Sequence, residues 1–195
     1  MPQVGTGSET DTLALVALGG NAISDRGGPA ETLRAALREL DGESVRLVAQ
    51  SPLYATPCFP PGAGPDFVNA AAVLETSLGA EALLTHLHGI ERRFGRTRRV
   101  RWGQRTLDLD LLDFGGQVRP DAAGHVHWRD LPPAKQKRQA PDEIILPHPR
   151  LQDRAFVLVP LADVAPDWRH PVTGQTVRQM LAALPEAEKA AIRAL

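Results

Sequence analysis

The segment T-L-D-L-D-L-L (residues 106–112) alternates leucine with aspartate over most of its length. Side chains in a β-strand point alternately to its two faces, so this pattern predicts a strand that buries its leucines on one face. Asp108 and Asp110 would stand side by side on the other face. Two neighbouring carboxylates repel each other unless a positive group lies between them. Mg²⁺ is usually held by one or two carboxylates together with phosphate oxygens, so the pair predicts a magnesium site.

An arginine-rich segment leads directly into this predicted strand. Seven arginines lie between Arg92 and Arg105, and guanidinium groups are well suited to hold polyphosphate. Carboxylates, an implied metal ion and guanidinium groups together favour phosphoryl-transfer chemistry. Each feature alone has a plainer interpretation, because a D-x-D strand is more often a solvated face and an arginine run is more often a solvated loop or a nucleic-acid patch. The adjacency of the two features favours the functional interpretation.

Length, charge and cysteine content narrow the class of protein. The chain has 195 residues, enough for one domain with a substantial core, and we expect a single domain over 1–195. The formal net charge is −1, so the arginine cluster is local, which argues against general nucleic-acid binding. Cys58 is the only cysteine, which excludes an intrachain disulfide and fits a reducing compartment. No apolar run approaches the ~20 residues that span a membrane. Residues 1–11 are polar and lack the features of a signal peptide, so we expect a disordered lead-in to a cytoplasmic protein.

The order of the predicted elements indicates the fold. An apolar run over 12–18 predicts a strand, and the leucine spacing over 29–40 predicts an amphipathic helix. The remaining elements of the core are expected to be strands over 45–54 and 67–74, a helix over 80–94, and the D-x-D strand up to residue 114. The order β-α-β-β-α-β is that of a ferredoxin-like α+β fold, an antiparallel sheet with the two helices on one face.

The chain after residue 114 has a weaker pattern. Residues 119–141 are polar and have no clear period, so we expect an exposed insertion. His125 and His127 within it have the spacing of possible metal ligands, but no third ligand is in reach, which disfavours a metal site. A C-terminal extension of the core is expected to contain a short strand over 144–146 and helical segments over 154–162 and 177–184.

Five motifs occur in order along nearly the whole chain. They are L-G-G-N (18–21), S-P-L-Y-A-T-P (51–57), P-D-F-V-N-A-A (65–71), R-W-G-Q-R-T-L-D-L-D-L-L (101–112) and L-P-H-P-R-L-Q-D-R-A-F-V-L-V-P-L (146–161). With these motifs the chain resembles the 6-hydroxymethyl-7,8-dihydropterin pyrophosphokinase family of folate biosynthesis, and the R-W-G-x-R-T-x-D-x-D block is highly specific. The resemblance implies a ferredoxin-like core and the transfer of a whole pyrophosphoryl group from ATP to the hydroxymethyl oxygen of the pterin, leaving AMP.

The resemblance also implies roles on the nucleotide side of the site. Asp108 and Asp110 correspond to carboxylates that bind two Mg²⁺ ions bridging the ATP phosphates. The other implied residues are Arg96 and Arg98 on a mobile catalytic loop that closes over the nucleotide, Arg105 facing phosphate, Trp102 ordering the loop, Glu91 at the nucleotide site, and His148 and Arg154 contacting the triphosphate.

A second set of residues is implied on the pterin side. Phe67 and Phe156 correspond to two aromatic rings that sandwich the pterin, although core packing is the plainer interpretation of either residue alone. Asn69 corresponds to an amide that reads the pterin edge, and a polar amide inside an apolar strand needs a partner. The segment containing Thr56, Pro57 and Phe59 is implied to make backbone contacts with the same ring. We expect a monomer with two small-molecule substrates, ATP and the pterin, and no nucleic-acid or membrane partner.

The chain departs from the family pattern at three positions. Gly20 stands where the glycine-loop motif usually has serine, Gln104 where proline is common, and Phe67 where some members have tyrosine. A palm-like nucleotidyl transferase is the alternative enzyme, since it also places metal-binding carboxylates on a ferredoxin-like sheet, but it lacks the segments around Thr56 and Asn69. The other alternative is a nucleic-acid-binding module that uses the arginine segment, and the acidic pair beside that segment argues against it.

Overall fold

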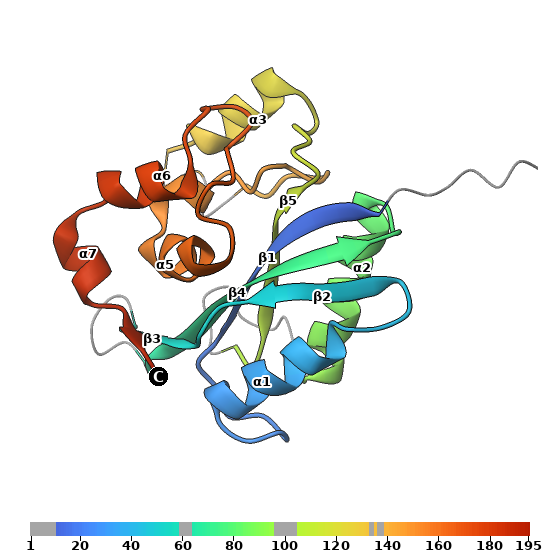
Figure 1. The fold of residues 1–195 in the computed structure, drawn as a ribbon, viewed down its shortest axis with the longest axis vertical. Helices are drawn as coiled ribbons and strands as arrows, with labels where there is room; N and C mark the ends of the chain where they lie inside the picture. The colour runs from blue at the N-terminus through green and yellow to red at the C-terminus, as the bar shows by residue number, and fades with distance from the viewer. Residues whose placement is uncertain (1–10, 59–63, 96–104, 133–134, 136–138) are drawn as a thin grey trace, which may run out of the picture.

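The computed structural model describes residues 11–58, 64–95, 105–132, 135 and 139–195, and it consists of a sheet with helices on both faces (Figure 1). The strands are β1 (Thr12–Gly20), β2 (Val45–Gln50), β3 (Tyr54–Thr56), β4 (Phe67–Thr76), β5 (Asp108–Phe114) and β6 (Arg193–Ala194). The helices are α1 (Pro29–Glu39), α2 (Ala80–Arg93), α3 (Ala122–Arg129), α5 (Ala155–Val164), α6 (Val177–Ala183) and α7 (Glu186–Ala190), with a short 3₁₀ helix η1 (Leu151–Asp153) before α5.

The centre of the sheet is formed by β1 and β4. The strand order is β5-β1-β4-β3-β6, and β2 also pairs with β4. The pairs that β1 makes with β4 and β5 are antiparallel, as are the pairs that β2 and β3 make with β4. The ferredoxin-like α+β fold expected from the order of elements is therefore confirmed.

One face of the sheet is covered by α1 and α2. The first helix begins at Pro29, whose ring suits the first turn because no intrahelical partner is lost there. The apolar stripes of both helices pack on strand residues such as Leu109, and burying each of these side chains contributes about 1.5–3 kcal/mol. The fully or almost fully buried residues of these stripes are Leu33, Leu37, Leu83, Leu87 and Ile90.

The opposite face is covered by α5 and α6. The apolar residues of α5 pack against the strand residues Ala71 and Leu112 on one side and against Val177 and Met180 of α6 on the other. Because α5 lies between the sheet and a second helix, it is apolar around most of its circumference. None of the helices in the described ranges is long and apolar enough to cross a membrane.

The expected strand over residues 45–54 is two strands instead. Pro52 has no backbone N–H to donate to a ladder, and β2 ends at Gln50 while β3 begins at Tyr54. Ser51 bridges the break, because its N–H donates to Ala71 O at 2.9 Å and its Oγ accepts from the Ala71 N–H at 3.0 Å. The other edge of β3 pairs with β6, a strand that the sequence pattern did not predict.

The expectation of an exposed insertion over residues 119–141 is wrong for its first half. Residues 122–129 form α3, whose first turn is capped by the Asp121 side chain accepting from the Gly124 N–H at 2.7 Å. His125 on this helix is 0% exposed, whereas His127 is exposed. An eight-residue helix whose one buried side chain is polar leaves no apolar period in the sequence. The expected strand over 144–146 is reduced to a single bridge between Leu146 and Arg119.

The register of the central strands brings predicted site residues onto one face. Gly19 of β1 lies opposite both Asp108 of β5 and Asn69 of β4, and Ala17 lies opposite Asp110. Residues directly opposite each other in antiparallel strands point to the same face. The backbones at Asp108 and Asn69 are thus two strand spacings apart, about 9–10 Å, on the face that α5 covers.

Candidate active site

Asp108 and Asp110 lie side by side on β5, half-buried, with the neighbouring leucines packed on the other face, as predicted. Asp108 forms an ion pair with the Nη1 atom of Arg105. Within the described ranges, Asp110 has neither a hydrogen bond nor an ion pair, and no group of three His, Cys, Asp or Glu side chains is arranged to hold a metal ion. Two carboxylates without a third protein ligand fit Mg²⁺, which completes its coordination with phosphate oxygens and water.

Asn21 holds Arg105 in place, a role that the sequence analysis missed. The backbone N–H of Arg105 donates to Asn21 Oδ1 at 3.0 Å, and the N–H of Asn21 donates to Arg105 O at 2.9 Å. The Nδ2 atom of Asn21 donates to Pro65 O at 3.2 Å. This buried amide therefore joins the end of β1 to the segments that enter β4 and β5. The signal was the L-G-G-N motif (18–21), which we used for the family resemblance without assigning a role to Asn21.

Gly20 allows the same segment to approach β1 closely. A Cβ atom on Gly20 would lie 2.5 Å from the backbone oxygen of Thr106, and it would also touch Leu33 at 3.4 Å. A backbone atom cannot move aside as a flexible side chain can, so glycine is the residue that this approach requires. The close backbone contact at this position therefore explains why the chain has glycine there and not serine.

Arg154 joins the two carboxylates in one charged cluster. It precedes the first turn of α5 as the N-cap residue. Burial lowers the pKa of Arg154, and the nearby charges of Asp110 and Asp108 oppose that lowering, whereas Arg150 and Arg105 add to it. Arginine remains charged even so, and the carboxylates and guanidinium groups of this cluster balance one another on the face that α5 covers.

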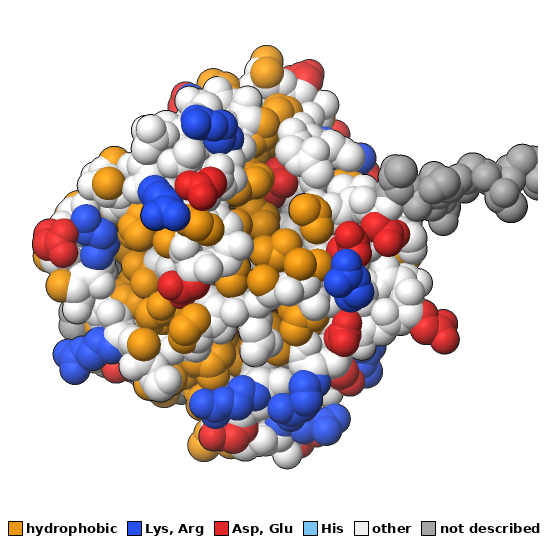
Figure 2. All heavy atoms as spheres, in the orientation of Figure 1, with side chains coloured by type: hydrophobic (Ala, Val, Ile, Leu, Met, Phe, Trp, Pro, Cys, Tyr) orange, Lys and Arg blue, Asp and Glu red, His pale blue; other side chains and the backbone are white. Residues whose placement is uncertain are grey.

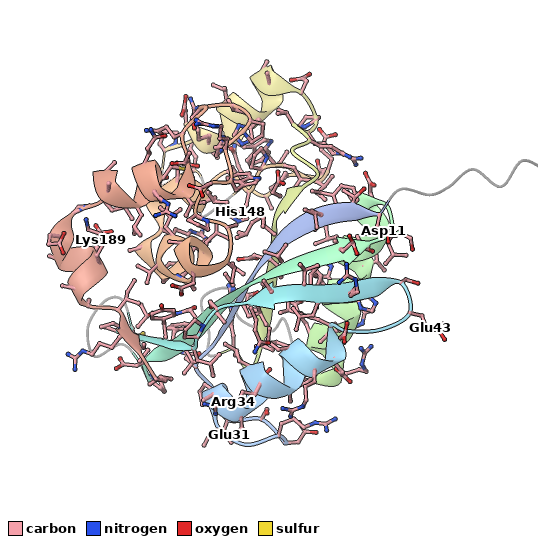
Figure 3. All side chains as sticks on the ribbon, in the orientation of Figure 1. Asp11, Glu31, Arg34, Glu43, His148 and Lys189 are labelled. Atoms are coloured by element: carbon pink, nitrogen blue, oxygen red, sulfur yellow. The ribbon has the colours of Figure 1, made fainter. Side chains whose placement is uncertain are left out.

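His148, labelled in Figure 3, is held by hydrogen bonds to both its backbone and its ring. Its backbone N–H donates to Leu112 O of β5 at 2.8 Å, and its Nδ1 accepts from the Arg150 N–H at 3.1 Å. Burial lowers the pKa of His148 to about 3, and the charge of Arg154 adds to the lowering. The ring is therefore neutral at pH 7, and its Nε2–H remains as a hydrogen-bond donor.

Three of the predicted pterin residues come together at the start of β4. Asn69 is 5% exposed, and its Nδ2 donates to Thr56 Oγ1 at 2.8 Å. Phe67 lies opposite Thr56 in the register of β3 and β4 and shares the face of Asn69. Gly19 leaves room for the Asn69 side chain beside them, because a Cβ atom there would lie 2.9 Å from Asn69 Oδ1.

Phe156 comes to this side of the sheet from α5. Its side chain is 37% exposed, which disfavours the plainer interpretation of core packing. The guanidinium carbon of Arg154 lies 5.7 Å from the centre of its ring, a cation–π distance. The first turn of α5 thus carries one residue predicted for each substrate.

Glu91 does not join the cluster. It lies on α2, on the opposite face of the sheet, and is 2% exposed. Its Oε1 accepts from the backbone N–H of Leu109 at 2.8 Å, so it supports β5 from the α2 side. Its assignment to the nucleotide site stays a prediction.

Several other predicted residues cannot be compared with this geometry. Pro57 is exposed at the end of β3. The remaining ones, Phe59, Arg96, Arg98, Trp102 and Gln104, lie outside the described residues.

Asp113 is a third carboxylate on β5 that the sequence analysis did not single out. It is 3% exposed, and its Oδ2 accepts from the Gly116 N–H at 3.1 Å and from Trp168 Nε1 at 3.2 Å. Burial raises the pKa of Asp113, although both hydrogen bonds oppose that change. Asp113 fastens the segment after α5 to the end of β5, which is a structural role.

A cavity of about 550 Å³ lies apart from these residues, between α1 and the edge of β2. Figure 2 shows basic side chains gathered over α1 at the lower edge of that face. None of the predicted site residues lines the cavity, whose walls are Arg34, Leu37, Arg38, Asp41, Leu47, Gln50, Ser51, Pro52, Leu53 and Leu195. The charged cluster on β5 remains the candidate site because it combines the carboxylates with the guanidinium groups.

Comparison with known proteins identifies sequence relatives over most of the chain. Residues 15–166 match the family described as 7,8-dihydro-6-hydroxymethylpterin-pyrophosphokinase. A 2-amino-4-hydroxy-6-hydroxymethyldihydropteridine pyrophosphokinase of Pseudomonas aeruginosa is 43% identical over 171 residues, which is 87% of this chain and 90% of the relative. The protein of the same name from Synechocystis is 38% identical over 170 residues, 86% of this chain and 74% of the relative.

Solved structures give the same fold at low sequence identity. The wild-type HPPK-DHPS of Plasmodium falciparum superposes with a TM-score of 0.60 at 14% identity. The match covers 90% of this chain but only 45% of that chain, so this chain spans about half of its length. This likeness supports the fold alone.

Proposed function

The chain belongs to the 7,8-dihydro-6-hydroxymethylpterin-pyrophosphokinase family, and from this membership we infer that it transfers pyrophosphate from ATP to the hydroxymethyl group of 6-hydroxymethyl-7,8-dihydropterin in folate biosynthesis. The main structural support for this arrangement of the site is the register of β5, β1 and β4. It sets Asp108 and Asn69 on either side of Gly19, so that a carboxylate and an amide lie on one face of the sheet.

On the nucleotide side, Asp108 and Asp110 would hold Mg²⁺. The ion would neutralise charge on the phosphate oxygens of ATP, and the family resemblance gives the number of ions as two. Arg154 and Arg105 would bind phosphate oxygens as cations. His148, with a pKa of about 3, would act as a neutral donor through Nε2–H and would not add charge at pH 7.

On the pterin side, Asn69 and Thr56 would meet the edge of the ring. The amide both donates and accepts, which suits a ring edge that presents both kinds of group. Phe67 and Phe156 would stack on its two faces, each contributing on the order of 1–3 kcal/mol by analogy with base stacking. The hydrogen bond between Asn69 and Thr56 keeps the amide oriented before the substrate arrives.

The reaction joins these two halves of the site. The hydroxymethyl oxygen of the pterin forms a bond to the β-phosphorus of ATP while the bond from that phosphorus to the oxygen bridging to the α-phosphate breaks. AMP leaves, and the hydroxyl proton passes to solvent. A loose transition state needs positioning and charge neutralisation more than a strong base, so the site works through fixed cations and hydrogen-bond donors aimed at the phosphates.

Product analysis tests this function directly. Purified protein with ATP, Mg²⁺ and the pterin should give AMP and the pterin diphosphate in equal amounts, whereas ADP as the product would contradict pyrophosphoryl transfer. The palm-like transferase and the nucleic-acid-binding module are not retained, since the family relationship covers both the acidic strand and the segments around Thr56 and Asn69. A monomeric state in solution remains our expectation.

A further inference from the structure

His125 is the only buried side chain of α3, and the proposed reaction does not use it. Helices ordinarily dock through apolar residues, whereas α3 docks through an imidazole that is 0% exposed. Gly124 leaves room for Pro120 beside the first turn of α3, since a Cβ atom there would lie 2.7 Å from Pro120 Cγ. A buried polar ring costs free energy unless its nitrogens are hydrogen-bonded, so the partners of His125 indicate why it is there.

The Nε2 atom of His125 lies 3.0 Å from the backbone oxygen of Pro147. A carbonyl oxygen can only accept, so Nε2 carries the proton and donates. The other nitrogen, Nδ1, therefore has a lone pair, and burial lowers the pKa of His125, which favours this neutral form. The tautomer is assigned from the hydrogen bond that the ring makes.

His170 faces His125 with the complementary tautomer. Its Nδ1 accepts from the backbone N–H groups of Val172 at 3.2 Å and Thr173 at 3.3 Å, so its Nε2 carries the proton. The ring centres are 5.5 Å apart at an angle of 68°. Among the described residues, neither His125 Nδ1 nor His170 Nε2 has a hydrogen-bond partner. One nitrogen has a lone pair and the other carries a proton, so the facing rings do not form a metal site, which needs a lone pair on both.

The Pro147 carbonyl belongs to the peptide unit that leads into His148. The oxygen of this unit accepts from His125, and its N–H, which is that of His148, donates to Leu112 O at 2.8 Å. Both polar groups of a single peptide are thus held, one by α3 and one by the metal-binding strand β5. A peptide plane held at both ends fixes the direction in which the next side chain leaves the backbone.

We propose that His125 is a positioning residue for the nucleotide side of the site: it orients the Pro147–His148 peptide, with the His170 ring packed against its own, and thereby presents the His148 ring to the triphosphate. This inference rests on the proposed role of His148 in ATP binding. The helix α3, which follows β5 after a short connection, then helps to position a residue of the nucleotide site.

Three variants test the role of the hydrogen bond. His125→Phe keeps a buried ring but loses the donor, so binding of a non-hydrolysable ATP analogue should weaken by about tenfold while pterin binding changes by less than about twofold. His125→Gln places an amide N–H near the position of Nε2 and should restore most of the affinity. His127→Gln, on the exposed side of the same helix, should bind like the wild type. Calorimetry with each ligand measures these affinities.

Two results would overturn the proposal. One is an unchanged affinity of His125→Phe for the ATP analogue. The other is an equal loss for both ligands without rescue by His125→Gln, since that marks a general packing defect. If His125→Phe does not fold, His125→Asn, which is smaller and also loses the Nε2 donor, takes its place.

A double-mutant cycle separates this proposal from the role given to His148. His148→Ala should weaken ATP binding, and adding His125→Phe to it should cause little further loss, because the two act through one group. Wild-type affinity in His148→Ala would refute the role of His148 itself. A clear loss in His148→Ala with fully additive effects in the double variant would refute only the action of His125 through His148.

Discussion

Asp110 is the residue on which the proposed metal chemistry should depend most. It stands beside Asp108 on the half-buried face of β5 that α5 covers, and Asp108 forms an ion pair with Arg105. We expect Asp110→Asn to reduce turnover by about 10³-fold, since one of two metal-binding carboxylates is lost. Its thermal stability without ligands should equal or exceed that of the wild type, because the repulsion between the two carboxylates is relieved. AMP formation and a melting curve measure both, and near-normal turnover in saturating Mg²⁺ would contradict the assignment.

Replacing Asn69 should weaken the binding of the pterin and leave the binding of ATP almost unchanged. Replacing it by alanine removes the hydrogen bond to Thr56 and the groups that would meet the pterin edge. We expect Asn69→Ala to weaken pterin binding by about ten- to a hundredfold, with ATP binding changed by less than about twofold. Calorimetric titration of each ligand is the measurement. Similar losses for the two ligands would indicate a folding defect and would remove the support for a pterin contact.

Position 20 should not tolerate serine, the residue that the family pattern usually has there. In Gly20→Ser the new Cβ atom would lie 2.5 Å from Thr106 O, so the backbone must move apart. We expect a loss of about 1–3 kcal/mol in the free energy of unfolding, and weaker ATP binding because the adjacent Asn21 no longer holds Arg105 as tightly. Gly79→Ser is the control, since a Cβ atom there meets nothing within 4 Å and serine suits the N-cap of α2. Urea unfolding of both variants measures the difference. Equal stability of Gly20→Ser and Gly79→Ser would contradict the steric argument.

At the scale of elements, α5 carries residues that we propose for both substrates. Its N-cap residue Arg154 lies in the charged cluster, and Phe156 in its first turn is exposed beside it at a cation–π distance. We expect Phe156→Leu to weaken pterin binding by about tenfold, because an aliphatic side chain cannot stack as a ring does. Its melting temperature should change little, since the ring is 37% exposed. Fluorescence or calorimetric titration of the pterin checks the affinity, and an unchanged affinity would place the stacking surface elsewhere.

The molecule as a whole should lose stability in mild acid. Burial lowers the pKa of His148 to about 3 and that of His170 to about 4. The unfolded chain takes up protons on these rings below about pH 6.5, whereas the folded chain does not. Their contribution to the free energy of unfolding is therefore complete above about pH 6.5 and is lost as the pH falls towards about 4.

Urea unfolding at a series of pH values between 7 and 4.5 measures this dependence. We expect the free energy of unfolding to fall steadily over that range in the wild type. His170→Asn, whose side-chain oxygen can accept from the same two backbone N–H groups, should show a shallower slope. Identical slopes in the two proteins would mean that other groups cause the loss in acid.

The local pattern of the chain determined the central elements and the strand that carries Asp108 and Asp110. Alternation over residues 106–112 requires leucines on one face and aspartates on the other whatever the surroundings, and β5 has that arrangement. Helical spacing likewise located α1 and α2 to within one residue of their ends. These features follow from neighbours in sequence, for which the period of the backbone is enough.

Tertiary structure alone decided how separate segments meet. The bonds by which Ser51 bridges the break between β2 and β3, the pairing of β3 with β6, and the burial of His125 on α3 depend on partners at least 18 residues away. The same holds for Asn21, which joins the entries to β4 and β5, and for Glu91, whose carboxylate supports β5 from α2. A buried polar group is stable only with a matching partner, and the identity of that partner is a property of the packed chain. The sequence therefore determined the chemistry each face could carry, and the fold decided which of those groups stand together.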